Sequence, residues 1–147
     1  MKTVAFLAAC MFLMGCTPAQ KEIDNIPFGA TFEQMNSDGK FNGLESSTDT
    51  RVPQASSSYL VRETADPNVF ARMYTFKNQR LVKYGCIYHP DGTSYSTLID
   101  RLTSVYGDKY SRMPVHNGEQ ITWEVPSHYV AAYFVGQYKG FEVIKDM

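Results

Sequence analysis

The chain has 147 residues, a length typical of one domain, and 44% of them are hydrophobic, which is enough for an ordinary apolar core. Its 14 Lys and Arg residues nearly balance its 15 Asp and Glu residues. Because nucleic-acid binding needs clustered basic side chains, this balance argues against a nucleic-acid partner.

Residues 1–15 have the pattern of a secretory signal peptide. Lys2 supplies a positive charge, and residues 4–13 form an apolar run of ten residues. A helix needs about 20 apolar residues to cross a bilayer, so this run is too short to be a permanent anchor.

The sequence Leu13-Met14-Gly15-Cys16 resembles the lipobox of bacterial lipoproteins, with a leucine, a small residue before the cleavage site and a cysteine after it. The resemblance implies that Cys16 becomes the lipidated N-terminus and that residues 16–25 form a polar tether. Thr17, in place of Asp, implies sorting to the outer membrane on its periplasmic side. The alternatives are the outer leaflet of the inner membrane, a Gram-positive cell membrane, and an ordinary secretory signal without lipid.

The first half of the remaining chain predicts one short helix and three strands. Thr31 and Gln34 fit a capping box that starts a helix at about 32–37. Residues 40–58 are polar and predict a long loop or a weakly paired edge, with Ser56–Ser58 exposed to solvent. Strands are predicted at 58–64, 69–76 and 81–89, the last two joined by a hairpin turn at 77–80.

The second half predicts a longer helix and three more strands. Apolar residues recur at helical spacing from 94 to 106, and Gly107 follows as a C-terminal cap. After a polar loop to Glu119, strands are predicted at 121–125, 128–135 and 141–145. We expect Trp123 to pack against the helix, near Leu98 and Leu102.

This order predicts an α+β fold for residues 26–147. Short turns between neighbouring strands imply a single antiparallel sheet of about six strands, backed by two helices. The arrangement would be a helix and three strands, repeated twice.

The domain also resembles β-lactamase-inhibitor-like repeats and small outer-membrane-assembly lipoproteins, which are α+β proteins. The positions that carry the resemblance are Phe76, Asn78, Leu81, Tyr95, Leu98, Leu102, Tyr106, Gly107, Thr122 and Trp123. The resemblance implies protein binding and carries over no catalytic residue.

Cysteine and histidine are the residues that invite a chemical role. Cys10 lies in the signal segment, so Cys86 has no disulfide partner in the domain, and strand alternation places it in the core with Val82, Tyr84 and Tyr88. Cys86 and His89 lack the second ligand pair of a structural zinc site. The expected topology brings His89 near His128 but leaves His116 at the other end of the sheet.

No nucleophile elbow or phosphate-binding loop is present, so the sequence predicts a protein without catalytic residues, cofactor or metal. The leading hypothesis is a membrane-anchored envelope lipoprotein whose domain binds another envelope protein. The second is an inhibitor or immunity protein against a hydrolase or toxin, and the third is a hydrolase of unfamiliar type. No small-molecule substrate is indicated.

Overall fold

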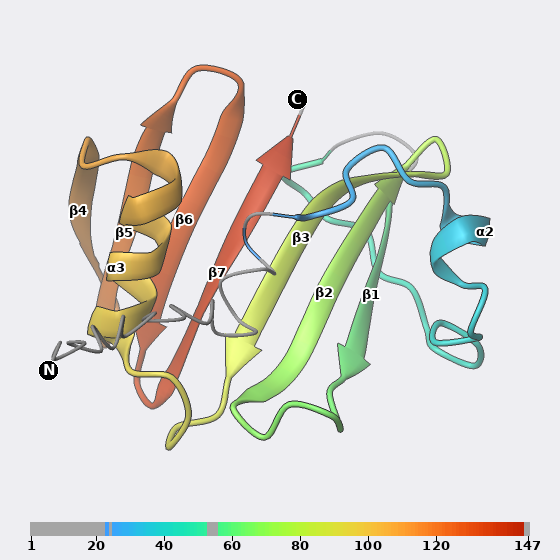
Figure 1. Ribbon diagram of the computed structural model, residues 1–147, viewed down its shortest axis with the longest axis horizontal. Helices are drawn as coiled ribbons and strands as arrows, with labels where there is room; N and C mark the ends of the chain where they lie inside the picture. The colour runs from blue at the N-terminus through green and yellow to red at the C-terminus, as the bar shows by residue number, and fades with distance from the viewer. Residues whose placement is uncertain (1–22, 24, 53–55, 146–147) are drawn as a thin grey trace, which may run out of the picture.

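The computed structural model describes residues 23, 25–52 and 56–145. The predicted signal segment, residues 1–15, and Cys16 lie outside the described residues. Within them, a single antiparallel sheet of seven strands has the order β1-β2-β3-β7-β6-β5-β4 (Figure 1). The strands are β1 Ser56–Arg62, β2 Val69–Lys77, β3 Arg80–Tyr88, β4 Tyr110–Val115, β5 Gly118–Val125, β6 His128–Val135 and β7 Tyr138–Lys145.

The α+β class and the single antiparallel sheet are confirmed, but the prediction of six strands was wrong. The additional strand is β4, within the segment that the sequence predicted as a polar loop. β4 is an edge strand with the sequence YSRMPV, and none of its residues is fully buried. It therefore lacks the alternation of apolar and polar residues that marks a half-buried strand.

The two helices lie at different places along the sheet. α2, Phe32–Met35, begins with the predicted capping box between Thr31 and Gln34, but it ends two residues earlier than predicted. α3, Tyr95–Tyr106, begins after Ser94 and lies over β6 and β7, while α2 lies at the β1 end of the sheet (Figure 1).

The predicted repeat is only approximate. The first half contributes a helix and three strands, and the second half contributes a helix and four strands. β3 and β7, the last strands of the two halves, lie side by side in the middle of the sheet.

The hydrophobic core lies on the helix-covered face of the sheet. Trp123 is buried there, as predicted, in the same cluster as Leu98 and Leu102, and its Nε1 donates a hydrogen bond to the Gly107 carbonyl at 3.0 Å. Ile23 belongs to this cluster too, so the chain is fixed to the domain from its first described residue.

One predicted core position is wrong. The pairing of β2 with β3 jumps from Thr75–Lys83 to Phe76–Leu81, which leaves Val82 without an opposite residue. This bulge turns Leu81 into the core in place of Val82, because an extra residue shifts the alternation by one.

Candidate functional site

The face of the sheet opposite the helices is partly covered by one loop, residues 44–52, which we call the strap. The strap starts on the outer side of β1, where Ser47 and Ser58 exchange backbone hydrogen bonds of 2.9 and 2.7 Å. It then places Asp49 beside β3 and Arg51 beside β7. The sequence predicted only a loop or weakly paired edge here.

The strap closes over two charged residues in the middle of the sheet, Lys83 and Glu142. Lys83 is fully buried, and its Nζ lies 2.5 Å from Asp49 Oδ2 and 3.0 Å from Glu142 Oε2. Arg51 pairs with the other oxygen of Glu142. Two buried charges on adjacent strands are thus matched by two opposite charges on the strap, as burial of charge requires.

The network keeps Asp49 ionised. Burial works to raise the pKa of Asp49, but the hydrogen bond from Lys83, the backbone N–H of Arg51 and both positive charges together lower it. Beside the network, the hydroxyls of Ser58 and Thr75 bond at 2.7 Å. The prediction that Ser56–Ser58 are solvated was wrong: Ser56 and Ser58 are buried in β1.

The part of this face that the strap leaves uncovered is what we call the open face. Strand register aligns one residue from each strand in a row across it: Arg62, Ala71, Ile87, Gly140, Tyr133, Gln120 and Met113. Beside the row, Leu60, Val135 and Tyr138 are exposed by 47%, 39% and 49%, and Met113 within it by 53%.

Two glycines shape the open face. A Cβ on Gly140 would come within 2.5 Å of the Tyr133 hydroxyl, and one on Gly85 would come within 3.2 Å of Met73 Cε. The missing side chains therefore let Tyr133 and Met73 lie flat against the sheet. Burial raises the pKa of Tyr133, so its hydroxyl stays protonated.

The row of residues across the open face resembles the centre of a protein interface in composition, whereas Glu124, which the register places on the same face, is charged and exposed. Arg62, at the β1 edge, is the charged member of the row; its other members are apolar, aromatic or neutral and polar. Interface centres are enriched in aromatic residues and Met and depleted in Lys, Glu and Asp. Exposed apolar side chains gathered on one face also mark sites of protein contact.

The β4 edge is poorly suited to receive another strand. Val115 and Gly118 flank a two-residue turn, so their backbone groups bond to each other. Hydrogen-bonded and non-hydrogen-bonded pairs alternate along an antiparallel ladder, so the backbone nitrogen of Pro114, in the next pair, faces outward from the edge of the sheet. Proline has no N–H, so an added strand would lose a backbone donor there. Proline at this position therefore makes the β4 edge unfavourable for the addition of a further strand.

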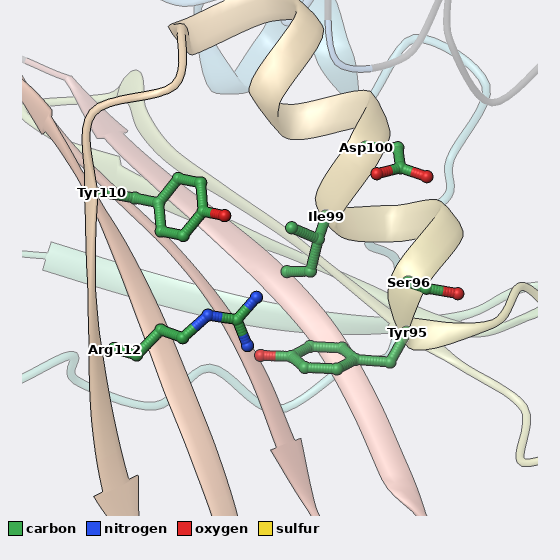
Figure 2. Close-up of a pocket in the computed structure, with 6 residues that line it drawn as sticks. All are labelled: Tyr95, Ser96, Ile99, Asp100, Tyr110 and Arg112. Atoms are coloured by element: carbon green, nitrogen blue, oxygen red, sulfur yellow. The ribbon is translucent and has the colours of Figure 1, made fainter.

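A separate pocket of about 250 Å³ lies on the helix side, between the start of α3 and β4, as Figure 2 shows. Its lining residues are Tyr95, Ser96, Ile99, Asp100, Tyr110 and Arg112. The guanidinium of Arg112 points toward the hydroxyl of Tyr95 (Figure 2).

The cysteine and histidines lie apart from these features. Cys86 is in the core as predicted, and burial raises the pKa of its thiol to about 11, which keeps it protonated. Among the described residues, no group of three or more His, Cys, Asp and Glu side chains could hold a metal ion.

The expected placement of the histidines was wrong. Tyr88, next to His89, pairs with Lys139 at one end of β7, whereas His128 pairs with Lys145 at the other end. His116, in the β4–β5 turn, lies at the same end of the sheet as His89, because the missed strand β4 returns the chain to that end.

Comparison of the chain with protein-family models, with curated proteins and with solved structures finds no match. In the part of the chain that the structure describes, no helix has the length and apolar character needed to cross a bilayer.

Proposed function

We propose that the protein is an envelope lipoprotein, anchored through Cys16 at the outer membrane, whose domain binds another envelope protein without performing catalysis. The observation that carries the proposal is the open face, with Leu60, Met113, Val135 and Tyr138 exposed on a rigid sheet. The lipobox pattern supports the anchor.

The open face also defines the chemistry of its partner. Seven strands are six spacings of about 4.8 Å, so the row is roughly 29 Å wide, a size suited to a folded protein. Tyr133, Gln120 and Tyr138 offer neutral hydrogen-bonding groups beside the apolar side chains. The matching surface is apolar and polar but poor in charge, because an unpaired charge buried there would be strongly unfavourable.

The docking prediction is tested with the full-length protein in its own membranes. We expect Met113→Glu and Tyr138→Glu each to reduce cross-linked recovery of the partner at least tenfold, since an interface charge without a counter-charge costs more than about 1.4 kcal/mol. Ser104→Glu, an exposed residue of α3 on the helix side, is the matched control and should bind as the wild type does.

Equal recovery from all three variants would show that the partner contacts another surface. Failure of the wild type to recover any stoichiometric partner would count against protein binding itself. A captured hydrolase or toxin whose activity falls on binding would instead identify the inhibitor role.

The anchor is tested separately. We expect Cys16→Ser to abolish incorporation of radioactive palmitate and to leave the precursor uncleaved by the lipoprotein peptidase, because the thiol is the acylated group. Thr17→Ser, beside it, should be labelled normally. Palmitate labelling that survived the loss of Cys16 would contradict lipidation at this position.

A further inference from the structure

The pocket between α3 and β4 exists because the helix and the edge strand diverge. Leu98 and Leu102 of α3 are fully buried, whereas Tyr95 and Ile99 lie on the side of the helix that lines the pocket. From β4, Tyr110 and Arg112 extend toward the helix, since Tyr110 pairs with Trp123 and shares its face. A space remains between the two elements.

The polar side chains that converge on this space are hydrogen-bond donors. The Tyr95 hydroxyl is buried and has no hydrogen-bond partner in the described structure. Burial, with the charge of Glu119, raises the pKa of Tyr95 to about 12, so the hydroxyl keeps its proton at physiological pH. A buried hydroxyl without a partner is destabilising, and a bound acceptor would supply the missing hydrogen bond.

Arg112 provides the second set of donors. Its Nη1 bonds the carboxylate of Glu119 at 3.1 and 3.3 Å, and its guanidinium lies 5.6 Å from the centre of the Tyr110 ring. These contacts orient the side chain, and because a guanidinium has five N–H donors, the bonds from Nη1 to Glu119 do not use all of them. The side chains of Ser96 and Asp100 point to the other side of α3, away from Arg112 and Tyr110 (Figure 2).

The remaining walls are apolar or aromatic. Ile99 and the ring of Tyr110 face the space, and the ring of Tyr95 is held by a tilted contact with Phe134, with centroids 5.6 Å apart. A ligand for this pocket needs an acceptor group at one end and a small apolar body at the other. Carboxylate is the acceptor that matches the fork of an arginine.

We infer that the pocket binds a small organic carboxylate, with its oxygens on the Tyr95 hydroxyl and Arg112 and its apolar part against Ile99 and Tyr110. The carboxylate belongs to a free short-chain acid or to the C-terminus of a peptide. This site lies on the helix side of the sheet, so it is independent of the proposed docking on the open face.

The probe is isovalerate, titrated into the full-length protein in detergent. Trp123 is the single tryptophan of the chain, and its ring centroid lies 5.6 Å from that of Tyr110. We expect isovalerate to change the tryptophan fluorescence in a saturable way, and isovaleramide, which lacks the charge, to bind at least tenfold more weakly. Tighter binding of acetyl-leucine than of isovalerate would identify a peptide C-terminus, and the reverse a free acid.

Tyr95→Phe separates binding from stability. It should weaken isovalerate binding at least tenfold, yet leave the melting temperature without ligand unchanged or higher, because it removes an unsatisfied buried hydroxyl and keeps the ring. Tyr129→Phe, which loses a hydroxyl on the opposite face, should bind isovalerate as the wild type does. Equal binding of the acid and the amide, no binding of either, or unaltered binding by Tyr95→Phe would overturn the inference.

Discussion

Lys83→Met should lower the free energy of unfolding by about 3–5 kcal/mol, the usual effect of removing one partner from a buried ion pair. The reason is geometric: Lys83 is fully buried, and its ammonium is shared between Asp49 and Glu142. Without it, Glu142 remains almost fully buried with only Arg51 beside it. Because domains have about 5–15 kcal/mol of stability, urea unfolding will show the loss clearly.

A second substitution tests the explanation. Lys83→Met combined with Glu142→Leu removes both buried charges and leaves Asp49 and Arg51 to pair with each other on the strap, where they already lie 3.7 Å apart. The double variant should recover most of the lost stability, since apolar replacements of whole ion pairs are often neutral or stabilising. Lys109→Met, at an exposed lysine, should change stability by less than about 0.5 kcal/mol. A double variant as unstable as the single one would show that the charges themselves are needed.

Trp123→Ala should lower the free energy of unfolding by about 3–5 kcal/mol, as expected for truncation of a large buried aromatic side chain. Trp123 fills the space between β5 and α3, and it also satisfies the Gly107 carbonyl at the end of the helix. Its removal leaves a cavity and breaks this hydrogen bond, so both effects act in the same direction.

The control for this prediction is Glu124→Ala, the next residue of β5, which is exposed and should change stability by less than about 0.5 kcal/mol. Thermal and urea unfolding followed by circular dichroism measure both variants. A loss below about 1 kcal/mol for Trp123→Ala would contradict the assignment of strand faces.

The sequence predicted best the elements in which one side is buried. β6 was predicted at residues 128–135, its actual bounds, and the predicted helix at 94–106 differs from α3 by one residue. The turn at Asn78 and Gln79 was also predicted, and both residues have the positive φ of a tight hairpin. Alternation, helical spacing and turn residues act locally, so they can be recognised without the fold.

The elements missed are those that depend on distant contacts. β4 borders one strand only and exposes most of its side chains, so no apolar pattern distinguishes it from a loop. The strap is polar, yet it is fixed by pairs that join Asp49 to Lys83 and Arg51 to Glu142, far along the chain. The available signal was Lys83 itself, a charge in the middle of a strongly apolar strand, which requires a counter-charge from elsewhere.

The pocket and the open face could not be predicted from sequence for a related reason. Tyr95 was correctly placed on the apolar stripe of the helix, but its hydroxyl lies beside Arg112 only because β4 returns along the edge of the sheet. Likewise, Leu60 and Met113 join one surface only through the order of seven strands. The sequence predicted protein binding, but the surface that we propose for it could be recognised only from the register of the strands.

The burial of Ile23 would limit how far a lipid-anchored form of the domain could reach from its membrane. A lipid on Cys16 would leave six residues, 17–22, before the chain enters the core, and the seven steps from Cys16 to Ile23 span at most about 25 Å when extended. Ile23 packs in the core on the helix-covered face, so a lipid on Cys16 would hold the domain close to the bilayer. A partner of such an anchored domain would therefore have to extend to within a few nanometres of the membrane, which favours proteins that are themselves held at the same surface.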